Sequence, residues 1–327
     1  MKLSGFLRDK ASASPARVLL PEGYDPRVRE AAGRAAGLGV CRPVLLLAPG
    51  EADGFAAAGA EILDPSSPEI MNAAAAAWSA AKNLSPDEAR ARCSSRLGLA
   101  SGLLAAGRAD GMVAGAAHAT ADVLRPALEL RKLYIGIPPV VSCFLFEVPD
   151  KSFGDDGLLV FADCGMNPDP AAPMLAQIAG AAGKAAREIL GLEPRVALLS
   201  FSTKGSADHP SVLKVRQALE IARQKFPGLA LDGELQGDAA LVPWVGEKKA
   251  PGSAVAGKAN VLVFPDLNSG NIAYKLVERL AGARAIGPVV LGLTPPVNDL
   301  SRGCSADDII DMCAVTSVQA AAGKQRR

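Results

Sequence analysis

The stretch Arg17-Val18-Leu19-Leu20-Pro21-Glu22-Gly23-Tyr24-Asp25-Pro26 decides the fold class, because it joins a buried strand to a helix. Residues 17–20 form a buried-type strand, in which Val18-Leu19-Leu20 is an apolar run of the kind that parallel sheets bury on both faces. Pro21-Glu22-Gly23 ends the strand, and Pro26 opens a helix whose apolar positions continue to about Leu38. This unit predicts a chain built from strand–helix–strand repeats.

The same alternation continues almost from end to end of the 327 residues. It favours parallel sheets covered by helices on both faces. Residues 140–147 and 157–163 flank a Gly- and Asp-rich turn and predict one hairpin, and residues 1–16 predict a short docking helix. Further strands are expected at 43–47, 60–63, 111–114, 196–201, 229–232, 259–264 and 286–291, and helices at 69–82, 86–106, 173–190, 211–225, 272–280 and 306–322.

Two proline pairs, Pro138-Pro139 and Pro295-Pro296, bracket the second half of this series. We therefore expect a first α/β domain at residues 1–139 plus 293–327, with the C-terminal helix returning to it. Residues 140–292 form an inserted second domain. The predicted fold is two doubly wound three-layer α/β/α domains, and the cleft between them is the expected active site.

Composition narrows the function classes. Lys and Arg total 35 against 34 Asp and Glu, and without a basic stripe we expect no nucleic-acid partner. No apolar run reaches about 18 residues, so we expect no membrane span. Six cysteines without a C-x-x-C pair and without a signal peptide indicate reduced thiols in a cytoplasmic protein. Two histidines are too few for a His-based metal site, and no metal is expected.

The segment at residues 297–309 carries the strongest chemical signal. Ser305 is a plausible N-cap, with Asp308 three residues later completing a box-like arrangement. Ser301 and Arg302 directly precede this helix start. Arg302 suits an anion, Ser301 can hold a polar group and Asp308 could accept a proton, which together fit acyl transfer to or from phosphate. A capped helix with a surface ion pair explains the same spacing.

Two further loops follow predicted strands, where open α/β sheets bind ligands. Ser202, Thr203 and Lys204 stand before Gly205 and suit phosphate, although a polar loop is the alternative. The 265–271 loop leads into the helix that carries Tyr274 and Lys275, with Asn271 expected near its N-terminus. This segment is either a second arm of the site or a capped helix start.

Other polar groups allow more than one interpretation. Thr120 and Arg125 follow the strand at 111–114, and Arg125 could meet a phosphate or hold a domain contact. His118 alone is more typical of a structural histidine. The carboxylates of Asp232, Glu234 and Asp238 could bind a divalent metal, but we favour a structural role buttressing Lys204 or Lys275.

One near-match fails. The segment Gly252-Ser253-Ala254-Val255-Ala256-Gly257-Lys258-Ala259 approaches a nucleotide-binding P-loop. Its last position is Ala rather than Ser or Thr, and a strand follows where a helix is required. The sequence also has no G-x-G-x-x-G between a strand and a helix, which argues against a dehydrogenase.

Taken in order, these segments resemble phosphate acetyltransferase, of the phosphate acetyl/butyryltransferase family, over nearly the whole chain. Single pieces are weak, but so many in one order are highly specific. The matching segments are Leu20-Pro21-Glu22-Gly23, residues 110–118, Leu124-Arg125-Pro126-Ala127, Phe161-Ala162-Asp163, and residues 199–207, 231–238, 249–260, 264–275, 298–305 and 308–309.

The resemblance implies reversible transfer of an acetyl group between CoA and phosphate by a homodimer, with CoA and acetyl-CoA as substrates and no bound cofactor. Carried over by motif, Asp308 would deprotonate the CoA thiol, and Ser301 would position the thiol or stabilise the tetrahedral intermediate. Arg302 would hold phosphate, and Arg125 would contact CoA or the phosphate side of the cleft. In this ternary scheme Cys304 is not needed as a nucleophile. The other implied phosphate contacts are Thr120, Ser202, Thr203, Lys204, Tyr274 and Lys275.

Two departures from the family pattern remove positive charge. Trp78 stands where the family usually has an arginine linked with CoA, and Thr294-Pro295-Pro296 replaces Ala-Lys-Pro. Lys82 could substitute for that arginine, or Trp78 could stack on the CoA adenine. We predict weaker CoA affinity than in a typical member. A phosphate acyltransferase for propionyl or butyryl groups and a non-catalytic acetyl-CoA-sensing module are the alternative functions.

Overall fold

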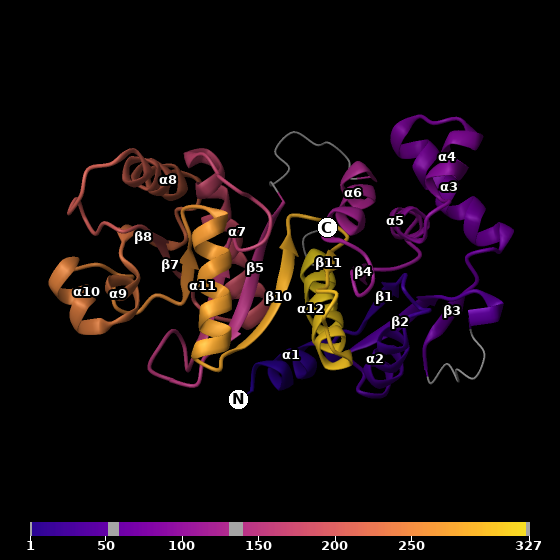
Figure 1. Cartoon of the computed structure of the whole chain (residues 1–327), viewed down its shortest axis with the longest axis horizontal. Helices are drawn as coiled ribbons and strands as arrows, with labels where there is room; N and C mark the ends of the chain where they lie inside the picture. Colours follow the sequence, from indigo (N-terminus) through magenta and orange to yellow (C-terminus); the bar gives the residue numbers. More distant parts are fainter. Residues whose placement is uncertain (1, 52–58, 131–139, 325–327) are drawn as a thin grey trace. The chain divides into compact units, whose positions relative to one another are not determined.

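The computed structural model describes residues 2–51, 59–130 and 140–324, and the chain divides into two compact units. The first unit comprises residues 3–137 and 293–327, and the second comprises residues 138–292. The proline pair Pro138-Pro139 lies outside the described residues. Each unit contains its own sheet (Figure 1).

The first unit is built on a five-stranded parallel sheet with the order β11-β4-β1-β2-β3. All four residues of β4 are buried, as expected for a strand covered on both faces. The strands are β1 (Ala16–Leu20), β2 (Cys41–Leu46), β3 (Glu61–Leu63), β4 (Gly111–Ala114) and β11 (Val297–Asp299).

Helices cover both faces of this sheet (Figure 1). One layer holds α1 (Leu3–Ser12), α2 (Pro26–Gly37) and α12 (Ala306–Lys324), and the other holds α3 (Pro68–Lys82), α5 (Arg96–Ala105) and α6 (Thr120–Leu130), with α4 (Pro86–Arg92) packed on α3 and a 3-10 turn at Pro49–Glu51.

The helix α12 is the central helix of its layer, since twelve of its nineteen residues are buried. It packs on α1, α2, β1 and β4. Arg8 and Ser4 of α1 reach the buried Asp311 carboxylate at 2.7 and 2.6 Å, which fixes the N-terminal helix on α12 as a docking element.

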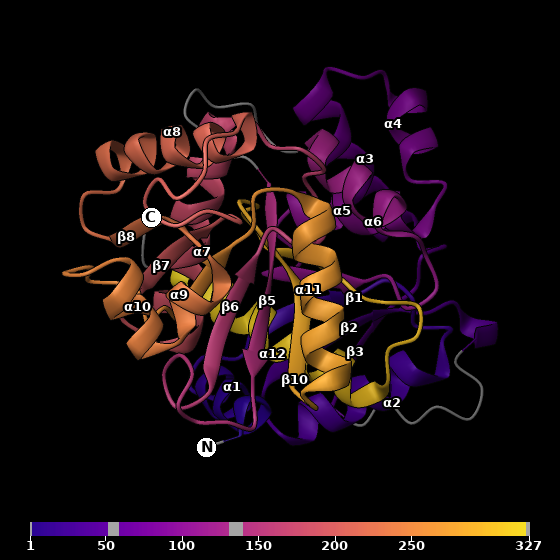
Figure 2. The ribbon, with the colours of Figure 1, turned by 60° about the vertical axis from the view of Figure 1, so that its left-hand side comes forward.

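The second unit is a six-stranded mixed sheet with the order β10-β5-β6-β9-β7-β8 (Figure 2). The predicted hairpin is confirmed, because β5 pairs antiparallel with β6, and β10 adds to β5 in the same manner. The strands are β5 (Val141–Glu147), β6 (Leu158–Ala162), β7 (Arg195–Leu199), β8 (Ala230–Leu235), β9 (Val261–Val263) and β10 (Arg284–Leu291).

Aromatic and aliphatic side chains fill the core of the second unit. The rings of Phe146 and Phe161 lie 4.5 Å apart, and those of Phe161 and Phe264 lie 5.4 Å apart. The helices that cover the sheet are α7 (Ala172–Leu190) and α8 (Pro210–Lys225) in one layer, and α9 (Gly237–Leu241), α10 (Pro243–Lys249) and α11 (Leu267–Leu280) in the other.

Three predicted elements differ from the structure. The single helix expected at 86–106 is two helices, because the Ser95 side chain accepts a hydrogen bond from the Gly98 N–H and begins α5. The strand expected at 196–201 ends at Leu199, and Phe201 is exposed. The helix expected at 272–280 begins at Leu267, where the Asp266 carboxylate caps it by accepting from the Ser269 N–H.

Candidate active site

The loop between β11 and α12 presents Ser301 and Arg302 to solvent. We call residues 301–304 the Ser301 turn. The Cys304 N–H donates to the Ser301 carbonyl at 2.9 Å, and the Gly303 N–H lies 3.3 Å from Ser301 Oγ. Over the described part of the chain, the Arg302 guanidinium has no hydrogen-bond or ion-pair partner. An exposed, unpaired guanidinium can bind an anion without breaking a protein contact.

The predicted capping box at the start of α12 is present. Asp308 Oδ2 accepts from the Ser305 N–H at 2.9 Å and from Ser305 Oγ at 2.8 Å. In return the Asp308 N–H donates to Ser305 Oγ at 3.2 Å. These contacts hold the Asp308 carboxylate in the first turn of α12, four residues beyond the Ser301 turn.

The ends of β1 and β4 are joined by a buried carboxylate. Glu22 is 1% exposed and accepts hydrogen bonds from the N–H groups of Gly115, Ala116 and Ala117, each at 2.9 Å. His118 Nδ1 lies 2.6 Å from the same carboxylate. His118 therefore has the structural role that is typical of a lone histidine, and Glu22 shapes the segment after β4.

Asp299, the last residue of β11, is a second buried carboxylate near the Ser301 turn. It is 2% exposed, and its Oδ2 accepts a 2.5 Å hydrogen bond from the Thr120 hydroxyl. Burial raises the pKa of Asp299 to about 6, against the opposing effect of the Thr120 hydrogen bond. Its Oδ1 has no partner among the described residues, and a Cβ on Gly115 would lie only 2.4 Å from it. Thr120 therefore anchors α6 to the end of β11.

The Cys304 thiol is not activated. It is 7% exposed, and burial raises its pKa to about 11 although the nearby Arg27 charge lowers it. Only the thiolate is nucleophilic, so this cysteine is inert at neutral pH.

The structure corrects the expectation for Trp78. Its ring is 1% exposed, and its Nε1–H donates to the Gly98 carbonyl at 3.0 Å. The Arg92 guanidinium lies 5.7 Å from the ring centroid. A buried indole with its donor satisfied packs α3 against α5 and cannot stack on a CoA adenine. Lys82, at the end of α3, and Arg125, on α6, are exposed.

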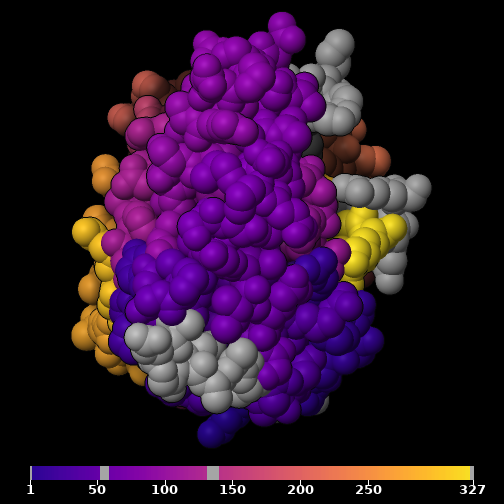
Figure 3. Space-filling model, turned by 90° about the vertical axis from the view of Figure 1, so that its right-hand side faces the viewer, coloured from indigo at the N-terminus to yellow at the C-terminus, as the bar shows by residue number. Residues whose placement is uncertain are grey.

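Figure 3 shows one face of the first unit. The violet atoms of the helical segment that contains α3, α4 and α5 lie above the indigo atoms of the N-terminal segment. Trp78 belongs to α3, and almost none of its ring is exposed.

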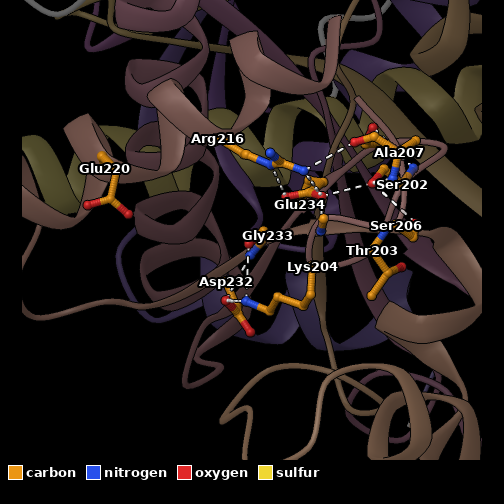
Figure 4. Close-up of polar contacts among 12 residues, drawn as sticks. Ser202, Thr203, Lys204, Ser206, Ala207, Arg216, Glu220, Asp232, Gly233 and Glu234 are labelled. Carbon is orange, nitrogen blue, oxygen red and sulfur yellow. Dashed lines mark hydrogen bonds and ion pairs between the residues drawn. The ribbon is translucent and has the colours of Figure 1, made fainter. Parts of the chain in front are cut away.

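In the second unit, residues 200–207 form a loop that we call the Lys204 loop (Figure 4). Glu234 of β8 organises it: its carboxylate accepts from Ser202 Oγ and the Gly205 N–H, each at 2.9 Å, and from Arg216 at 3.0 Å. Burial alone would raise the pKa of Glu234, but the hydrogen bonds from Arg216, Gly205 and Ser202 lower it to about 2.

The loop places its predicted phosphate ligands differently from expectation. Ser202 and Thr203 are buried, and the Thr203 hydroxyl exchanges hydrogen bonds with Gln236. Their hydroxyls therefore build the loop and do not face a ligand. Lys204 Nζ pairs with Asp232 and donates to the Gly233 carbonyl at 3.1 Å.

The acidic residues of this region form ion pairs. Asp232 buttresses Lys204, as favoured from the sequence, and Asp238 pairs with Lys249 at 2.9 Å. No group of His, Cys, Asp and Glu side chains in the described ranges is arranged to hold a metal ion.

The α11 residues lie beyond the helix start. Tyr274 stacks on Phe144 with ring centroids 4.1 Å apart, and the Lys275 ammonium lies 4.9 Å from the Tyr274 ring. Asn271 lies in the second turn and donates to the Cys164 carbonyl at 3.1 Å, so it does not offer a helix-terminal anion site. Lys275 is exposed.

Sequence reasoning missed three groups that contact loops of the first unit, Glu22, Arg27 and Asp299, and one that contacts the Lys204 loop of the second unit, Arg216. The available signal for Asp299 was its position between the apolar residues Val297 and Leu300, next to Asn298. The others reveal their role only through partners far away in sequence.

The chain has two three-layer α/β units, and one of them displays a serine, an arginine and a carboxylate at the start of a buried helix, groups whose chemistry suits acyl transfer. The sequence model of the family described as "Phosphate acetyl/butaryl transferase" matches residues 4–317. The phosphate acetyltransferase of Thermoanaerobacterium thermosaccharolyticum is 49% identical over 98% of this chain and 100% of that protein. The chain belongs to the phosphate acetyl/butyryltransferase family and is an acyltransferase of the phosphate acetyltransferase type.

Solved structures agree with this assignment. A phosphotransacetylase from Streptococcus pyogenes superposes with a TM-score of 0.89 at 42% identity, covering 98% of both chains. The EutD phosphotransacetylase from Staphylococcus aureus also gives 0.89, at 38% identity over 97% of this chain and 98% of that one. In the described ranges no helix combines the length and apolar character needed to span a bilayer.

Proposed function

We propose that the chain transfers an acetyl group between CoA and inorganic phosphate in a ternary complex, by direct attack of the CoA thiolate on acetyl phosphate. The observation that carries this proposal is the start of α12, where the Ser301 turn contains Arg302, which has no partner among the described residues, and is followed by the fixed Asp308 carboxylate. The buried, protonated Cys304 supports direct transfer, because it offers no nucleophile for an acyl-enzyme.

In the proposed reaction, Asp308 takes the proton of the CoA thiol. The thiolate sulfur bonds to the acetyl carbon, and the resulting tetrahedral oxyanion accepts a hydrogen bond from the Ser301 hydroxyl. The bond from carbon to the phosphate oxygen then breaks, phosphate leaves against Arg302, and the proton passes from Asp308 to phosphate.

Deprotonation of the CoA thiol by Asp308 can account for only a small part of the rate enhancement. A thiol pKa of about 8.5 leaves roughly 3% thiolate at pH 7, so complete deprotonation gains only about 30-fold, or about 2 kcal/mol. Holding both substrates in line is worth far more, up to about 7–11 kcal/mol in favourable cases. We therefore assign Arg302, assisted by Arg125 and Lys82 on the CoA side and by Lys275 for phosphate, chiefly to positioning.

The test is an assay of the purified full chain for thioester formation from acetyl phosphate and CoA, with propionyl and butyryl phosphate in parallel. We expect acetyl phosphate to be the best substrate and the double-reciprocal lines to intersect. Parallel lines, or exchange of labelled phosphate into acetyl phosphate without CoA, would show an acyl-enzyme and contradict the proposal. Faster butyryl transfer would establish the wider acyl specificity instead.

The neighbouring carboxylates provide a matched pair of variants. Asp308→Asn should lower kcat by up to about 30-fold at pH 7, the gain from complete deprotonation of the thiol. Asp307 is 55% exposed and pairs with Arg34 at 2.7 Å, so Asp307→Asn should retain turnover. Equal losses in the two variants would remove Asp308 as the base. The homodimer implied by the resemblance and the cytoplasmic location indicated by the cysteines stay predictions.

A further inference from the structure

Arg27 contacts the Ser301 turn and the segment after β4 from the first turn of a helix. It is the second residue of α2, whose N-cap is Asp25. Its Nε and one Nη2 hydrogen point to the Asp25 carboxylate, at 3.1 and 2.7 Å. Nη2 also donates to the Ala116 carbonyl at 2.8 Å. Nη1 donates to the carbonyls of Arg302 at 2.9 Å and Cys304 at 3.0 Å.

These contacts use all five N–H donors of the guanidinium. Arg27 could bind a phosphate group only by giving up one of them, whereas Arg302 loses nothing. The positive charge of Arg27 also faces the Asp25 carboxylate, whose pKa is lowered by the hydrogen bond from Arg27. The two arginines therefore have different tasks.

We propose that Arg27 is a positioning residue that sets the conformation of the Ser301 turn without contacting substrate. This proposal rests on the proposed function, because the turn carries Ser301 and Arg302. Within the turn, the backbone is closed by the single bond from the Cys304 N–H to the Ser301 carbonyl. Arg27 adds one hydrogen bond on each side of Gly303, to the carbonyls of Arg302 and Cys304. Through its bond to the Ala116 carbonyl, it also connects the turn to the segment after β4.

Lysine cannot reproduce this arrangement. Its ammonium has three donors and lacks the planar fork that reaches two carbonyls and a carboxylate together. Arg27→Lys keeps the positive charge while removing at least two of the five bonds, so it isolates geometry from charge.

The first measurement is steady-state kinetics of Arg27→Lys and Arg27→Gln in the full chain. A misplaced Ser301 turn should lower kcat by on the order of 100-fold while KM for CoA changes little. Arg29→Lys is the matched control, because Arg29 lies on the same helix and donates to the Gly23 and Tyr24 carbonyls. We expect it to retain kcat. Raised KM at unchanged kcat would make Arg27 a binding residue and overturn the proposal.

The second measurement follows the turn itself, by site-resolved alkylation of Cys304 at about pH 8.5, near the pKa of a free thiol. In the wild type Cys304 is buried and labels slowly. Both Arg27 variants should label roughly ten-fold faster, since local opening exposes the thiol. Charge cannot cause this increase: the Arg27 charge lowers the Cys304 pKa, so its loss in Arg27→Gln would slow labelling if the turn stayed in place.

The two measurements distinguish a failure of the proposed function from a failure of the positioning role of Arg27. A wild-type chain with no acyl transfer contradicts the proposed function, while Cys304 labelling still tests what Arg27 holds. A fall in kcat with unchanged Cys304 labelling in both variants would refute the positioning role.

Discussion

Replacing Asp299 by Asn should change how the stability of the first unit depends on pH. In the folded unit the pKa of Asp299 is about 6, above its ordinary value of 3.8. The folded state therefore binds this proton more tightly than the unfolded state does. The stability that this proton confers is fully present below about pH 4 and is lost as the pH rises through 6.

The size of the effect follows from the shift. A difference of about two pKa units, at about 1.4 kcal/mol each, corresponds to about 3 kcal/mol over the whole titration. Asp299 is 2% exposed, so solvent screening does not reduce this value much. The side-chain amide of the Asp299→Asn variant cannot titrate. The unfolding free energy of this variant minus that of the wild type should thus rise by about 2 kcal/mol from about pH 4 to pH 7. Constant differences in packing or hydrogen bonding cancel in this comparison.

Tryptophan fluorescence can report on the first unit alone. The chain has two tryptophans, the buried Trp78 of the first unit and the exposed Trp244 of the second. Urea unfolding in a Trp244→Phe background therefore follows the unit that contains Asp299. Thr120→Val removes the hydrogen bond that lowers the Asp299 pKa, and should move the midpoint of the pH dependence upward. A wild-type-minus-variant difference that is flat between about pH 4 and pH 8 would refute this reasoning.

Three further predictions concern other buried groups. Glu234→Gln should destabilise the second unit by up to about 3 kcal/mol at pH 7, because the folded pKa of Glu234 is lowered to about 2. The loss should fade as the pH falls from 4.5 towards 2. Urea unfolding followed by circular dichroism measures it, and equal losses at pH 7 and pH 2.5 would contradict it. Trp78→Phe should cost about 1–3 kcal/mol through the lost hydrogen bond to Gly98, as measured by circular dichroism, without changing KM for CoA. A raised KM would restore Trp78 to the CoA site. Cys304→Ser should retain most of kcat, and loss of turnover in a folded variant would point to a thiol-dependent step.

The sequence predicts the strand–helix alternation well because both faces of the sheets are buried. Short, largely apolar runs such as 17–20 and 111–114 can therefore be recognised as strands. It also predicts the capping box of Ser305 and Asp308, which is a local pattern. The three-residue strand β11 escapes prediction, since pairing with β4 and not local propensity makes it a strand. The split between α4 and α5 depends on the hydrogen bond from the Gly98 N–H to the Ser95 hydroxyl. The spacing of apolar residues gives no sign of this bond.

The site is predictable only as far as its chemistry is local in sequence. Ser301, Arg302 and Asp308 lie within eight residues of each other, and the sequence names all three. Trp78 was assigned to a ligand because an arginine was expected there, whereas its burial depends on the packing of α3 against α5. The contacts of Arg27 with residues 302 and 304 span more than 270 positions, so only the folded chain reveals them.

The discontinuous first unit has a consequence for synthesis on the ribosome. Its sheet needs β11 beside β4, and its central helix is α12, but residues 140–292 are translated in between. At about 5–20 residues per second, that segment occupies roughly 8–30 s. During this interval the edge of β4 that pairs with β11 is unpaired, and the surface of the first unit on which α12 packs is uncovered. The second unit can already fold in the same period. The segment that completes the scaffold is also the one that carries Ser301, Arg302 and Asp308. A nascent chain therefore gains the proposed catalytic groups only when β11 and α12 complete the first unit.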